Sequence, residues 1–140
     1  MSWMDARMAQ QREIAARKRL ISEHAAATFE ALWEKLKEQI AEAKSRDFPI
    51  FTNGSPQIRT VGIPVSPAAG ETSRSADSFT LSLDKAEGCI LASGDRGVDF
   101  RFHLDVCPDN VVCLKWQGAP ISIDDAAVKL LDRFLFPDLA

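Results

Sequence analysis

The feature that most constrains the fold is the run over residues 5–46, which contains neither glycine nor proline. It ends at Asp47-Phe48-Pro49, because proline disfavours a helical conformation in the residue before it. From Leu20 onward, apolar residues recur with a helical period and form one wide face. Before residue 20 that face carries polar residues: Arg7, Gln11 and Lys18. We therefore expect one helix whose second half packs on a core and whose first half does not.

The length of this helix divides the chain into two parts. At 1.5 Å per residue, residues 5–46 span roughly 60 Å, whereas a compact chain of 140 residues is about 37 Å across. Unless the helix breaks near residue 19, its first half projects from the domain, and we predict that residues 1–19 form an exposed basic helical arm and that residues 20–140 form a single domain. The arm has a net charge of +3 and carries four large apolar side chains, which we predict to be interaction residues: Trp3, Met4, Met8 and Ile14.

Residues 79–117 alternate between apolar and polar side chains and are interrupted by three turns, which predicts an antiparallel meander with one buried face. The expected turn loops are 85–87, 95–96 and 108–110. They place these residues on the buried face: Phe79, Leu81, Leu83, Cys89, Leu91, Val98, Phe100, Phe102, Leu104, Val106, Val112, Leu114 and Trp116. Residues 57–65 are a candidate fifth strand at the edge of the sheet. Residues 47–56 are expected to form a turn-rich connection, and residues 66–78 a long loop.

The chain closes with a second predicted helix. Ser122 is a favourable N-cap, with two acidic residues in the first turn after it, and the helix is expected to stop before Pro137. The predicted fold class is therefore α+β: a long N-terminal helix, an antiparallel β-meander of four to five strands, and a C-terminal helix packed on the sheet. This order of elements resembles, in outline, that of small bacterial chaperone and adaptor domains.

Composition excludes several classes of protein. The net charge of −3 is not that of a nucleic-acid binder, and no apolar run reaches the ~20 residues that cross a bilayer. The N-terminus mixes charged and apolar residues, so no signal peptide is predicted. The three cysteines show no metal-binding spacing. Cys107 and Cys113 are predicted to lie too far apart for a disulfide, so we expect reduced thiols and a cytoplasmic location.

A candidate ligand site lies on the polar face of the meander, where Arg101, His103 and Lys115 are expected to come together. A histidine near carboxylates and cations is able to act as a general base. The same pattern is, however, what any half-exposed strand requires, and no nucleophile or oxyanion element accompanies it. His24 has no partner in its own segment for a metal site. No cofactor, metal or phosphate-loop motif is present.

Two hypotheses for function follow. The first is a non-catalytic interaction protein of the adaptor or small-chaperone kind, which forms a homo-oligomer or binds a protein partner through its N-terminal helix. The second is a small-molecule-binding domain or an enzyme that uses the polar strand face around His103. The missing catalytic motifs and the overlong first helix favour the first hypothesis. Nucleic-acid binding through the basic arm is a weaker third reading.

Overall fold

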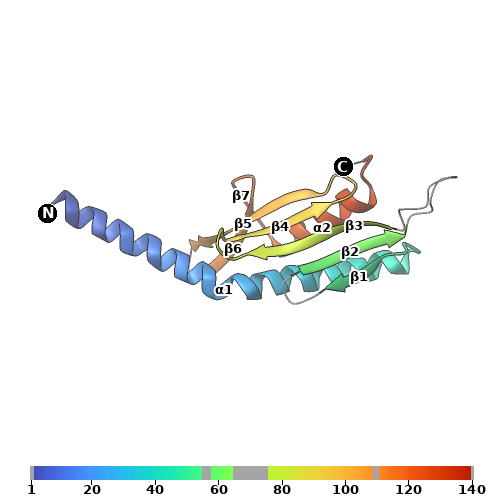
Figure 1. Cartoon of the computed structure of the whole chain (residues 1–140), viewed down its shortest axis with the longest axis horizontal. Helices are drawn as coiled ribbons and strands as arrows, with labels where there is room; N and C mark the ends of the chain where they lie inside the picture. The colour runs from blue at the N-terminus through green and yellow to red at the C-terminus, as the bar shows by residue number, and fades with distance from the viewer. Residues whose placement is uncertain (1, 55–57, 65–75, 109–110, 140) are drawn as a thin grey trace.

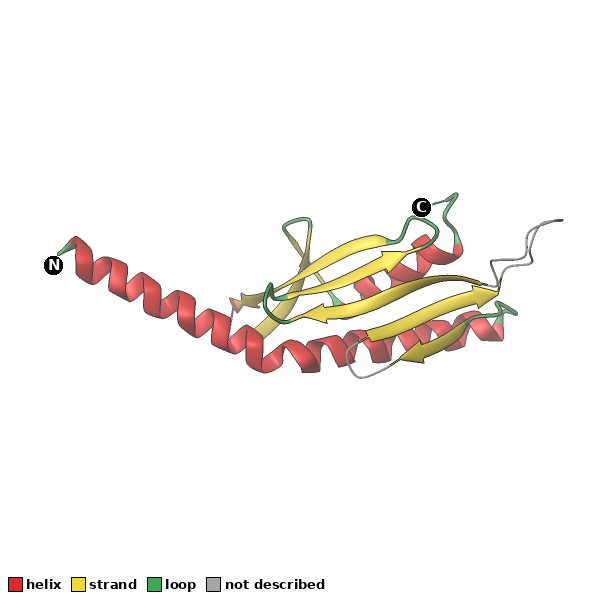
Figure 2. Cartoon of the chain, viewed as in Figure 1, coloured by secondary structure: helices red, strands yellow, loops and turns green. Residues whose placement is uncertain are grey.

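The computed structural model describes residues 2–54, 58–64, 76–108 and 111–139. It confirms the α+β class, with a long helix at the start, an antiparallel sheet, and a helix near the C-terminus (Figure 2). The elements in chain order are α1 (Trp3–Ser45), β1 (Phe51–Gly54), β2 (Ile58–Pro64), β3 (Ala76–Asp84), β4 (Cys89–Gly94), β5 (Asp99–Cys107), β6 (Val111–Trp116), β7 (Ala119–Ile121) and α2 (Ile123–Leu135).

Within the described residues, the strands form one seven-stranded sheet in the order of the chain, and every neighbouring pair is antiparallel. This is a simple meander, but with more strands than the four to five predicted. The extra strands are short: β1 lies inside the predicted connection 47–56, and β7 follows a turn at Gln117 and Gly118, both at positive φ. A short strand with exposed side chains has no alternation of burial, so the sequence pattern does not reveal it.

The first helix is continuous, and it projects well beyond the sheet (Figure 1). It starts at an N-cap, Ser2, whose side chain accepts a hydrogen bond from the Asp5 backbone N–H. It ends before Asp47, which has a positive φ of 68°. The buried positions begin only at Ala25 and continue with Phe29, Leu32, Trp33, Leu36, Ile40 and Ala43. The division of this helix into a core half and a half outside the core is therefore confirmed.

The core lies between the sheet and the two helices. Among its fully buried side chains are Phe79 of β3 and Phe134 of α2, whose ring centroids are 4.9 Å apart in an edge-on arrangement. The predicted N-cap of α2 is confirmed, because the Ser122 hydroxyl accepts a hydrogen bond from the Asp125 backbone N–H at 3.0 Å. Helix α2 thus packs its apolar face on the sheet, as expected.

The register of β5 against β6 is as predicted, with Leu104 opposite Leu114 and His103 opposite Lys115. The predicted register of β4 is wrong by one residue. Asp84 pairs with Cys89, and the Gly94 N–H bonds to the Val98 carbonyl, so each flanking turn is one residue longer than predicted. The reason is that Gly88 and Gly97 take positive φ inside the turns, where glycine is favoured, instead of starting the strands.

This error in register changes which side chains face the core only within β4. Ile90 and Ala92 are buried on the core face in place of the predicted Cys89 and Leu91. Because the two errors cancel, β5 keeps its predicted face. Cys89 is nevertheless buried, and burial raises the pKa of its thiol. The predicted loop 66–78 is also too long at its end, since β3 starts at Ala76; residues 66–75 lie outside the described residues.

The expectation of unpaired cysteines is wrong for Cys107 and Cys113, which form a disulfide. The predicted pairing of Cys107 with Val111 holds, so the two cysteines are diagonal neighbours on one face of the hairpin. Strand twist shortens one diagonal of an antiparallel pair, and their Cα atoms are 6.0 Å apart, within bridging range. The expectation of a cytoplasmic location was based on unpaired thiols, and the disulfide removes that basis.

Candidate interaction surface

The first candidate surface is the arm. Every residue from Ser2 to Arg19 is exposed, and burial begins only at Leu20 and beyond. The four predicted interaction residues are large apolar side chains in this exposed segment: Trp3 is 75% exposed, Met4 56%, Met8 46% and Ile14 54%. Solvent-exposed apolar side chains that gather on one projecting element are typical of a protein contact surface.

Charge separates the arm from the rest of the chain. The whole chain carries −3 and residues 1–19 carry +3, which leaves −6 on residues 20–140. The arm therefore combines exposed apolar side chains with positive charge, and it is joined to an acidic body. This combination favours a partner surface that is apolar in the middle and acidic at its rim.

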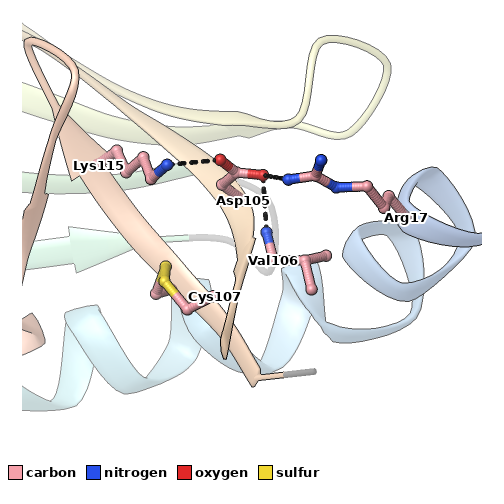
Figure 3. A network of polar contacts seen from close by, with 6 residues as sticks. Arg17, Asp105, Val106, Cys107 and Lys115 are labelled. Atoms are coloured by element: carbon pink, nitrogen blue, oxygen red, sulfur yellow. Dashed lines mark hydrogen bonds and ion pairs between the residues drawn. A yellow bond between two sulfur atoms is a disulfide. The ribbon is translucent and has the colours of Figure 1, made fainter. Parts of the chain in front are cut away.

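The base of the arm is attached to the sheet by a carboxylate (Figure 3). Asp105 on β5 accepts from Arg17 Nη2 at 2.9 Å and from the Val106 backbone N–H at 2.8 Å, and its other oxygen contacts Lys115 Nζ at 2.8 Å. The hydrogen bond from Lys115, together with the Val106 N–H and Arg17, lowers the pKa of Asp105. The contact to Arg17 ties the last turns of the arm to the outer face of the sheet.

A second candidate surface lies between the two helices. They run side by side in the same direction, since Lys35 contacts Asp124 at the start of α2 and Phe48 contacts the ring of Phe136 just after its end. Two separate apolar grooves lie along α1 and are here together named the α1–α2 crease: one between α1, β6 and the first residue of α2, the other between α1 and the second half of α2. One groove of about 340 Å³ is lined by His24, Ala27, Thr28, Ala31, Val111, Val112 and Ile123. The other, of about 270 Å³, is lined by Gln39, Glu42, Ala43, Arg46, Phe48, Val128, Leu131, Asp132, Leu135 and Phe136.

The floor of the crease is apolar and its rim is charged. Val128 is 47% exposed and Phe136 40% exposed. Lys35 lies between the grooves and contacts Glu38 Oε2 at 3.1 Å and Asp124 Oδ1 at 3.2 Å. The hydrogen bonds that Lys35 donates to the Glu38 and Asp124 carboxylates raise the pKa of Lys35. The sequence gives only one sign of this crease. Val128 is an apolar residue of α2 that lies outside the set of buried positions on that helix.

The predicted ligand residues do lie on the outer face of the sheet. His103 is opposite Lys115, but Lys115 is occupied by the ion pair to Asp105, and the side chains of Arg101 and His103 are exposed. The residues that line the two grooves of the crease lie elsewhere. Within the described ranges there is no group of three or more His, Cys, Asp or Glu that is able to hold a metal ion.

Comparison with known proteins gives no relative: no protein-family model, no curated protein and no solved structure matches the chain. Among the helices that the structure describes, none is long and apolar enough to cross a membrane.

Proposed function

We propose that this protein is a non-catalytic interaction domain of the adaptor or small-chaperone kind, which self-associates through its N-terminal helix. The observation that carries the proposal is the arm: a helix that is continuous with a core helix, exposed from residues 2 to 19, and provided with four large apolar side chains. The chain accordingly divides into an interaction segment, residues 1–19, and a single α+β domain, residues 20–140.

Exposure of the arm has a cost that a partner removes. Each apolar side chain contributes stabilisation of roughly 25 cal/mol per Å² when it leaves water. In proteins most of the stability of a helix comes from packing of an apolar face; the arm is exposed along residues 3–19 and gains stability from docking. A second copy of the chain is the simplest partner, because a two-fold contact buries both arms with one surface.

The test is the mass of the full-length protein in solution, measured by sedimentation equilibrium over a range of concentrations. We expect a dimer that dissociates on dilution. A variant with Trp3, Met4, Met8 and Ile14 all changed to serine is expected to be a monomer that melts at the temperature of the wild-type protein diluted below its dissociation constant. A wild-type protein that stays monomeric at high concentration contradicts the proposal.

The matched control changes apolar residues that are equally exposed but lie outside the arm. Ile58 on β2 is 49% exposed and Leu139 is 83% exposed. Serine at these two positions is expected to leave the dimer intact. Loss of the dimer in the control and in the arm variant alike would show that overall surface hydrophobicity, and not the arm, drives association.

A further inference from the structure

We propose that the α1–α2 crease is the surface that receives the arm of a second copy of this chain. This inference rests on the proposed self-association and adds the docking site to it. The arm is then not paired with the other arm; each arm lies along the body of its partner, in a reciprocal exchange.

The dimensions of the two surfaces agree. The crease follows α1 from His24 to Arg46, roughly 33 Å at 1.5 Å per residue. The arm from Trp3 to Arg19 is about 25 Å long on the same scale. Laying an amphipathic helix into an apolar groove is a common mode of recognition. Small side chains let the backbone of such a helix approach closely, and the crease offers Ala27, Ala31 and Ala43.

A two-fold axis gives a consistent alignment of the two copies. If the two α1 helices run antiparallel about an axis beside residues 22 and 23, Ile14 of one copy lies opposite Ala31 of the other. The same axis sets Trp3 opposite Glu42, beside the second groove. Along the helix axis, the two ends of the exposed apolar set in the arm thus lie level with the two grooves of the crease.

Charge favours the same arrangement. The axis sets Arg7 opposite Glu38, and the rim of the crease carries more carboxylates than cations: Glu38, Glu42, Asp124 and Asp132 against Lys35 and Arg46. A basic arm against an acidic body is attractive in each of the two equivalent contacts. The alternative, in which the arms pair with each other, places two segments of charge +3 side by side, and like charges that close are unfavourable.

The experiment is a cross-link between full-length chains. Chains with Ile14→Cys are mixed with chains with Ala31→Cys and treated with a short bis-maleimide. The native cysteines do not interfere, because Cys89 is buried and Cys107 is bonded to Cys113. We expect a covalent dimer that contains one chain of each kind. Chains with Arg101→Cys, an exposed position on the opposite face of the sheet, replace Ala31→Cys as the control and are expected not to cross-link.

A second measurement uses the apolar floor of the crease. Val128→Lys removes an exposed apolar side chain and places a cation against the basic arm, so the dissociation constant of the dimer is expected to rise at least about tenfold. Ile58→Lys makes the same chemical change at a site of equal exposure, 49% against 47% for Val128, and is expected to leave the constant unchanged.

The outcomes separate this inference from the proposed function. A dimer in which Ile14→Cys chains cross-link to one another shows pairing of the arms, and overturns the crease while self-association stands. A dimer that gives neither cross-link, and whose dissociation constant is unchanged by Val128→Lys, likewise overturns the crease while self-association stands. A wild-type protein that is a monomer overturns both.

Discussion

Reduction of the Cys107–Cys113 disulfide is expected to lower the free energy of unfolding by an amount that follows from the loop it closes. The two cysteines are six positions apart in the sequence. Closing a loop of that size in the unfolded chain removes entropy worth about 2 kcal/mol at room temperature. For urea slopes of about 1–3 kcal/mol per molar, this is a fall of roughly 1–2 M in the midpoint of unfolding.

The assay is urea unfolding followed by tryptophan fluorescence, with and without a dithiol reductant. The double variant Cys107→Ala/Cys113→Ala is the control: it is expected to unfold at the midpoint of the reduced wild-type protein and to ignore the reductant. Cys89 is not expected to contribute, since it is buried and burial raises its pKa. Equal midpoints for the oxidised and reduced wild-type protein would refute the reasoning, because they would show that the bridge does not restrict the unfolded chain.

Three further predictions concern the core, the arm contact and the arm itself. Phe102→Ala is expected to cost about 3–5 kcal/mol in chemical unfolding, because Phe102 is fully buried; His103→Ala, exposed beside it, is expected to cost less than about 0.5 kcal/mol. The lowered pKa of Asp105 stabilises the fold above the carboxyl's unfolded pKa, and this contribution is lost as the pH falls through the folded value. The stability difference between the wild type and Asp105→Asn is therefore expected to shrink in acid titrations, and a difference independent of pH would exclude the ion pairs as its source. Deletion of residues 2–18, all exposed, is expected to leave the melting temperature of the monomer nearly unchanged in calorimetry; an unfolded product would show that the arm belongs to the domain.

The long-range features of the fold were predictable because each depends on a repeating pattern. The helical period that starts at Leu20 predicts which half of α1 is buried, and the alternation along β5 predicts the buried Phe102. The local features of the fold could not be predicted, because they depend on single residues at turns. Gly88 and Gly97 each lengthen a turn by one residue, and the sequence alone does not say whether a glycine belongs to the turn or to the strand.

The arm and the crease differ in the same respect: the arm could be predicted from the sequence and the crease could not. The arm was predictable, since a helix longer than its own domain has to project, and its exposed side chains can be read from the sequence. The crease arises where α2 lies beside α1, and no local pattern specifies how two helices distant in sequence pack together. The disulfide is a similar case: the register predicts that Cys107 and Cys113 are diagonal neighbours, and only the twist of the hairpin decides that they are close enough to bond.

The arm, the hairpin and the disulfide meet at one place, and this bears on the proposed docking of the arm. Asp105, which contacts Arg17, pairs with Cys113 and lies two residues before Cys107 in β5. The bridge that restricts the hairpin therefore also restricts the carboxylate that contacts the base of the arm. An arm whose direction is fixed loses less conformational entropy on docking than a mobile arm. It therefore binds with higher affinity. Single exposed ion pairs contribute little to folding stability, so under the proposed docking the Arg17–Asp105 contact acts mainly on the orientation of the arm, and Lys115 and Val106 provide most of the stabilisation of Asp105.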